Sequence, residues 1–336
     1  MMITRNEAGR DPLETLLMYA GRRESADPRH SERIEQHLYS HWQQLIQNRH
    51  AAAQRRRVRV FAGGFAVAAS LIMAAVILPR VLAPSPVVGH VATTIGVVES
   101  GARGKPLTRL GTGVALRAGS VLQTGDSAGA GLELLSGHSL RVAPASRVRI
   151  ETDSILLDRG QIYLDSGPTG RTKSITVHSS WATVRELGTQ YQVRLLADGL
   201  EVSVREGMVR LERDSDIVTA RAGESLRLEH DGHVRREAIL PHGERWQWVT
   251  QLGPVLDLND RTLAEFLEWL SRENGWRVIF ATASLQRDAQ SIELSGSVDG
   301  LGPEEALASV MATVAWRYTL ADGVVTIGIS DADLDR

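Results

Sequence analysis

Two pairs of histidines are the residues whose types and spacing could bind a metal. His37 and His41 stand four positions apart, a spacing that puts two ligands on one face of a helix. His230 and His233 flank Asp231 in HDGH, which is typical of an exposed β-turn. The sequence shows no third ligand for the first pair. The chain has 0 cysteines, which excludes thiolate zinc sites, disulfides and cysteine nucleophiles. We therefore expect no metal and no cofactor.

Catalytic motifs are missing from the sequence as well. It contains no P-loop, no HExxH, no Gly-x-Gly-x-x-Gly after a strand and no Ser/His/Asp signature. Asp257, Asp260, Glu293 and Asp299 are scattered, and no motif pairs them. The net charge of −2 gives no general argument for binding nucleic acid. We expect a protein that is not an enzyme, so its function must follow from the elements that it builds.

Residues 60–79 form an uncharged stretch, VFAGGFAVAASLIMAAVILP. As a helix this stretch would be about 30 Å long, the thickness of a hydrocarbon core. A soluble core helix usually has a polar stripe, which is missing here. A cleaved signal peptide would not follow so long an N-terminal region. The stretch therefore predicts one transmembrane helix.

The charges beside this stretch predict its orientation. Arg55, Arg56, Arg57 and Arg59 precede it, and Arg80 follows it. Basic residues stay on the cytoplasmic side, so these arginines act as a topology signal. We expect a single-pass inner-membrane protein with a cytoplasmic N-terminus and a periplasmic bulk.

Residues 1–59 predict a cytoplasmic region of two short amphipathic helices. The first begins at Asp11-Pro12, and the second begins near Asp27-Pro28. Short helices bury their apolar faces poorly alone, so they either pack on each other or bind a partner. The candidate partner contacts are Leu16, Leu17, Leu38, Trp42 and Leu45.

After a Pro-rich linker at 80–90, residues 91–240 consist of short alternating segments separated by turn signals. The signals recur about every ten residues and fit either hairpins or tight corners. They favour an all-β domain, built as a sandwich or as a solenoid-like stack.

One segment of this domain, WATVRELGTQYQVR at 181–194, changes its parity. Ala182 and Val184 are even-numbered, whereas Tyr191 and Val193 are odd-numbered, with Gly188 between the two sets. A strand has a side-chain period of two, so the change requires a bulge or a sharp bend. We interpret Gly188-Thr189 as a structural joint rather than as a catalytic site.

Residues 253–329 predict a small α+β module with the element order βαββαββ. A capping box from Thr262 to Glu265 begins the first helix, and Gly275 ends it. Gly302-Pro303 begins a second helix, and a hairpin turns at Asp322-Gly323.

The order of motifs between residues 119 and 228 resembles the FecR domain. The shared motifs are a Gly-Asp turn, a Gly-Ser hairpin, a Leu-x-x-Gly corner, a Gly-Thr-x-aromatic-x-Val strand and a Val-x-Glu-Gly hairpin. The fourth motif corresponds here to Gly188, Thr189, Tyr191 and Val193, and the fifth ends at Gly207. Tyr191 stands where the family usually has Phe. The C-terminal module resembles the STN module of secretins, TonB-dependent transducers and FecR-like regulators.

These resemblances imply a multi-domain chain with a helical cytoplasmic tail, one transmembrane helix, an all-β FecR domain and an α+β C-terminal module. They imply a regulator of an extracytoplasmic-function sigma factor that responds to the signalling domain of an outer-membrane TonB-dependent transducer. No nucleic-acid partner is expected. The alternative is a membrane-anchored periplasmic protein that is structural or binds the envelope, with no sigma partner.

Overall fold

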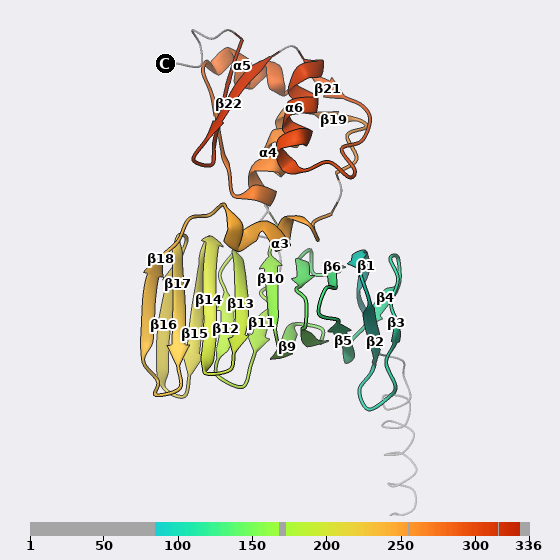
Figure 1. Ribbon diagram of the computed structural model, residues 1–336, viewed down its shortest axis with the longest axis vertical. Coiled ribbons are helices and arrows are strands. Elements are labelled where there is room, and N and C mark those ends of the chain that lie inside the picture. The colour runs from blue at the N-terminus through green and yellow to red at the C-terminus, as the bar shows by residue number, and fades with distance from the viewer. Residues whose placement is uncertain (1–84, 168–172, 255, 315, 330–336) are drawn as a thin grey trace, which may run out of the picture. The chain divides into compact units, whose positions relative to one another are not determined.

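The computed structural model describes residues 85–167, 173–254, 256–314 and 316–329, which belong to one compact unit (Figure 1). Two large β-sheets contain most of the regular secondary structure of these residues. The chain alternates between the two sheets. A hairpin in one sheet is usually followed by a corner that leads into the other.

Sheet A contains nine strands among the described residues, in the spatial order β18-β17-β14-β13-β10-β7-β6-β1-β4. Its strands are β1 (Val87–Ile95), β4 (Ala115–Arg117), β6 (Gly129–Leu134), β7 (Ser139–Val142), β10 (Gln161–Asp165), β13 (Gln190–Leu196), β14 (Gly199–Glu206), β17 (Glu224–Glu229) and β18 (Val234–Ala238).

Sheet B also contains nine strands in the described part of the chain, in the order β16-β15-β12-β11-β9-β8-β5-β2-β3. Its strands are β2 (Val98–Ala102), β3 (Thr108–Arg109), β5 (Ser120–Thr124), β8 (Arg147–Ile150), β9 (Ser154–Arg159), β11 (Thr176–His178), β12 (Thr183–Glu186), β15 (Met208–Arg213) and β16 (Asp216–Arg221).

One hydrophobic core joins the two sheets. Leu140, Ile162 and Val193 come from sheet A, and Leu122 and Val184 come from sheet B. All five side chains are fully buried. The strands follow one another across each sheet nearly in chain order, so the sandwich lengthens as the sequence proceeds.

Turn signals of one kind lead to two different outcomes. The turn around Gly137 closes the β6–β7 hairpin, in which Leu132 pairs with Leu140. Gly160 instead lies at a corner, because β9 belongs to sheet B and β10 belongs to sheet A. Both glycines have positive φ, so the local backbone is similar in a hairpin and in a corner.

Residues 239–254, called the connector from here on, follow β18. They contain a 3₁₀ turn η1 (Glu244–Trp246) and a short helix α3 (Gln247–Thr250). In Figure 1 the connector lies between the sandwich and the C-terminal module.

The C-terminal module has a core of its own, formed by α4, α6 and a three-stranded sheet. Its elements are β19 (Arg261–Thr262), α4 (Leu263–Asn274), β20 (Arg277–Phe280), α5 (Ala283–Ala289), β21 (Glu293–Leu294), α6 (Pro303–Thr313), β22 (Arg317–Ala321) and β23 (Val324–Gly328). The predicted capping box at Thr262 and the left-handed Gly275 are confirmed. Helix α5 is absent from the sequence prediction.

The fold class expected from the sequence is wrong. The expected fold class included a helical tail and one transmembrane helix. The described chain is instead mostly β-sheet. Among the described residues, α4 is the longest helix with 12 residues, and none combines the length and apolar character needed to cross a membrane. Residues 1–59 and 60–79, on which the two helical predictions fall, lie outside the described residues.

Candidate functional site

The Gly188-Thr189 segment is a corner between the two sheets. It leads the chain from β12 in sheet B to β13 in sheet A, and Gly188 has a φ of 73°. Glycine adopts this backbone more readily than any other residue. Ala182 and Val184 before the corner and Tyr191 and Val193 after it all face the same core, so the change in parity is the change of sheet.

A second corner lies directly against the first. Gly207, with a φ of 77°, leads from β14 in sheet A to β15 in sheet B. The backbone N–H of Leu187 donates to the carbonyl oxygen of Met208 at 3.0 Å. The hydroxyl of Thr189 donates to the same oxygen at 2.7 Å and accepts from the N–H of Leu187 at 3.2 Å. Thr189 thus fastens the two corners to each other.

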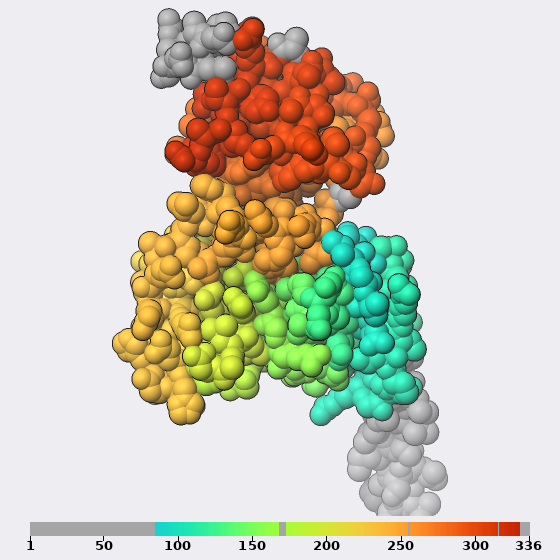
Figure 2. Space-filling view, in the orientation of Figure 1, coloured from blue at the N-terminus to red at the C-terminus, as the bar shows by residue number. Residues whose placement is uncertain are grey.

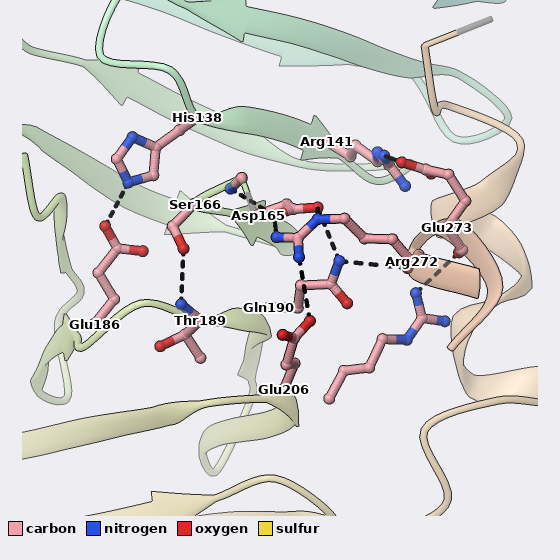
Figure 3. Close-up of polar contacts among 12 residues, drawn as sticks. His138, Arg141, Asp165, Ser166, Glu186, Thr189, Gln190, Glu206, Arg272 and Glu273 are labelled. Carbon is pink, nitrogen blue, oxygen red and sulfur yellow. Dashed lines mark hydrogen bonds and ion pairs between the residues drawn. The ribbon is translucent and has the colours of Figure 1, made fainter. Parts of the chain in front are cut away.

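A buried histidine and a buried glutamate connect the sheets beside these corners. His138 Nε2 lies 2.5 Å from Glu186 Oε1, and both side chains are almost completely buried (Figure 3). The same oxygen accepts the N–H of Ile175 at 2.8 Å. Burial raises the pKa of the Tyr191 hydroxyl, and the charge of Glu186 raises it further. This polar group therefore supports the fold at the point where the chain changes sheets.

The outer face of sheet A is a polar and aromatic layer. Arg141 on β7 is paired in register with Tyr163 on β10, and the Arg141 guanidinium lies 5.2 Å from the centre of the Tyr163 ring. Arg205 on β14 lies 4.5 Å from the ring centre of Trp246 in the connector. Burial lowers the pKa of Arg205 and raises that of Tyr163. Alternate residues of these strands therefore lie beneath other parts of the chain instead of facing solvent.

Two glycines make room for the connector on this face. A Cβ on Gly131 would come within 2.2 Å of the carbonyl oxygen of Leu252, and one on Gly129 within 2.7 Å of a Leu252 methyl group. Trp246 and Val249 pack with Tyr163 nearby. Figure 2 shows the connector residues, gold to orange, lying on the green strands of the sandwich.

The last turn of α4 makes ion pairs with the same face. Arg272 donates through Nε to Asp165 Oδ2 at 3.0 Å and through Nη2 to Asp165 Oδ1. Glu273 Oε2 lies 2.7 Å from Arg141 Nη2. Gln190 donates to Asp165 Oδ2 at 2.8 Å and to the carbonyl oxygen of Arg272 at 3.3 Å. Figure 3 shows this network joining the strands to the helix.

No sequence motif indicates this network. The motif residues Gly188, Thr189, Tyr191, Val193 and Gly207 instead lie at the adjoining corners and in the core. Arg141, Asp165 and Arg205 alternate with apolar residues, a pattern that ordinarily indicates a solvent-facing side. A partial signal was present in Arg272-Glu273, two opposite charges in the last helical turn before Gly275.

Other expected sites fall in two groups. Among the described residues, no group of three or more His, Asp or Glu side chains could hold a metal ion, and His233 lies in an exposed turn where its N–H donates to Asp231. The predicted partner contacts and topology signal lie outside the described residues, as does the histidine pair His37 and His41: the contacts are Leu16, Leu17, Leu38, Trp42 and Leu45, and the signal is Arg55, Arg56, Arg57 and Arg59.

Comparison with solved structures finds two crystal structures of a "putative anti-sigma factor" from Parabacteroides distasonis ATCC 8503, at 2.50 and 1.65 Å resolution. Each is 15% identical in sequence, covers 63% of this chain and 99% of that chain, and has a TM-score of 0.34. No curated protein matches this chain.

A family model described as "FecR protein" matches residues 120–210. The matched range runs from β5 through β12, the Gly188-Thr189 corner, β13 and β14 into β15. It therefore includes both corners and three of the strands that carry the polar layer. The match confirms the resemblance noted in the sequence. Over residues 120–210 this chain is therefore similar to FecR proteins.

Proposed function

We propose that this protein regulates a sigma factor of the extracytoplasmic-function class. The observation that carries the proposal is the FecR family match over residues 120–210. The role requires binding and release, not catalysis. The FecR domain and the C-terminal module would receive the signal, and residues 1–59 would hold or release the sigma factor.

We further propose that the signal comes from the periplasmic signalling domain of an outer-membrane TonB-dependent transducer. The resemblance of residues 253–329 to the STN module supports this partner. The proposed location of the described residues is the periplasm, and the arginines that precede residue 60 support it. A reporter that is active only in the periplasm tests the location. It should be active when fused after residue 90 or 336 and silent at residue 50, and the reverse pattern overturns the location.

Binding of the sigma factor is tested on the full chain. The sigma factor encoded nearest the gene is titrated against the wild-type protein and against Trp42→Ala. Helix-in-groove binding relies on apolar anchors, and interface hot spots favour Trp, so the substitution should cost about 2 kcal/mol or more, a roughly thirtyfold loss.

Gln43→Ala is the matched control, because Gln43 would lie opposite the apolar face in the helix expected from the sequence. It should bind as the wild type does. If the wild-type chain shows no binding at micromolar concentration, the sigma-factor role fails. An anchored structural or envelope-binding protein then becomes the better explanation.

A further inference from the structure

Arg272 and Glu273 place opposite charges side by side at the end of α4, and sheet A presents the complementary charges. Asp165 faces Arg272, and Arg141 faces Glu273. Strands β7 and β10 are neighbours, with Arg141 paired to Tyr163 and Asp165 two residues further along β10. The Arg141 and Asp165 side chains therefore belong to one face of one sheet. Exchanging the two charges, or sliding the helix by one residue, would oppose like charges.

Burial makes these ion pairs costly to break on one side. The side chains of Arg141 and Asp165 are 1% and 7% exposed, and those of Glu273 and Arg272 are 11% and 18% exposed. Removing one partner would leave the other charge buried and uncompensated. Burial acts to lower the pKa of Arg141 and of Arg272, but the paired carboxylates outweigh it and raise both pKa values.

A third cation holds the end of the same helix. Arg205 donates through Nη1 to the carbonyl oxygen of Glu273 at 3.0 Å and through Nε to that of Pro241 at 2.7 Å. The carbonyl groups of a last helical turn lack helical partners, so a cation there supplies hydrogen bonds and a favourable charge. Arg205 thus fastens both α4 and the connector to β14.

The network reaches the Gly188-Thr189 corner through two residues that follow Gly188. The N–H of Thr189 donates to the hydroxyl of Ser166 at 2.8 Å. Gln190 donates to Asp165 and to the backbone of Arg272, so one side chain touches both the sandwich and the helix. The side-chain amide of Gln190 therefore links the residues beside the corner directly to the end of α4.

We propose that the last turn of α4 is a lock that couples the C-terminal module to the Gly188-Thr189 corner of the FecR domain. A displacement of the module pulls on Asp165 and Gln190 and changes the stability of the corner, and a change at the corner loosens the helix end in return. Use of the lock to pass a signal rests on the proposed function, whereas the lock itself does not.

Hydrogen exchange on the purified full chain, without any partner, tests the lock. Arg272→Ala and Glu273→Gln should each accelerate exchange of the backbone N–H groups in residues 187–191 by about tenfold or more, because the substitutions release the corner from the helix. The reciprocal variant Asp165→Asn should accelerate exchange in the last turn of α4 by a similar factor. If these ion pairs stabilised only their own side of the contact, each substitution would leave backbone N–H exchange on the opposite side unchanged.

Arg261→Ala is the matched control, since Arg261 pairs with Glu265 at the other end of the same helix and both are exposed. It should leave residues 187–191 unchanged. Unchanged exchange there in Arg272→Ala and Glu273→Gln overturns the lock. If a variant instead loosens the whole sandwich, including β2, then Arg272→Lys decides. This variant keeps the charge but loses the bidentate ion pair with Asp165. It must accelerate backbone N–H exchange in residues 187–191 without accelerating it in the rest of the sandwich. If the wild-type chain does not bind a sigma factor, the proposed function fails, but the outcome of this hydrogen-exchange test is unaffected.

Discussion

Gly207 and Gly188 lie against each other at neighbouring corners, so closely that a Cβ on Gly207 would come within 2.2 Å of the carbonyl oxygen of Gly188. Gly188 itself has open space where its own Cβ would be. The two glycines therefore serve different needs. Gly188 supplies a backbone conformation, and Gly207 supplies both a conformation and room.

Substitution of Gly188 should cost only the strain of a positive φ. We expect Gly188→Val to destabilise the protein by about 1–3 kcal/mol. Gly188→Asn should cost much less, because Asn tolerates the left-handed region. Gly207→Ala should cost more than Gly188→Ala, since it adds a steric clash. Chemical denaturation of the four variants gives the ranking, and equal costs at the two corners would refute the distinction.

Glu186 is expected to be essential for the junction between the sheets. Glu186→Ala removes the acceptor of both His138 Nε2 and the Ile175 N–H, and each buried group left unsatisfied costs about 1–3 kcal/mol. The control is Glu212→Ala, whose partner Arg185 is exposed, and which should cost less than about 1 kcal/mol. Unfolding midpoints measure both, and similar losses would show that the buried pair contributes nothing special.

Gly131 should be intolerant of a methyl group because the connector lies on it. Gly131→Ala would push away Leu252 and with it the segment that carries Trp246 and Trp248. We expect a red shift in tryptophan emission and a lower unfolding midpoint. Gly125→Ala is the control, because its Cβ would meet Val97 at an ordinary 3.5 Å. An unshifted tryptophan emission spectrum in Gly131→Ala would argue against the packing of the connector on Gly131.

Local sequence signals predicted the features that depend on a few neighbouring residues. The Thr262 capping box, the end of α4 at Gly275 and the Asp322-Gly323 hairpin are of this kind. The sequence could not distinguish a hairpin from a corner, since Gly137 and Gly160 adopt nearly the same φ. What separates them is whether the next strand pairs with the previous one or crosses the core, which depends on distant strands.

The candidate site was harder to predict for the same reason. Period-two alternation identifies the two faces of a strand, but it does not tell which outer face another segment will cover. Arg141 and Arg205 therefore had the pattern of surface residues, although the connector and α4 bury both. Helix α5 was missed because it has seven residues and little apolar periodicity.

Helix α4 should lose part of its N-terminal stabilisation in acid. Glu265 accepts the N–H of Thr262 at 2.8 Å, and this bond, followed in importance by Arg261, holds the pKa of Glu265 below its ordinary value of 4.5. A carboxyl whose pKa is lower in the folded than in the unfolded protein stabilises the fold above the unfolded pKa. Its contribution disappears as the pH falls through the lowered folded value.

Glu265→Gln should therefore destabilise the protein at neutral pH, and the difference from wild type should shrink as the pH falls below about 4.5. Glu268→Gln, an exposed residue on the same helix, should show no such convergence. Thr262→Ala removes the other half of the box and should cost about 1 kcal/mol. Exchange of the first N–H groups of α4, followed from pH 7 to pH 3 with the rates corrected for pH, measures all three. If the gap between wild type and Glu265→Gln persists unchanged to pH 3, the ionised carboxylate is not what caps the helix.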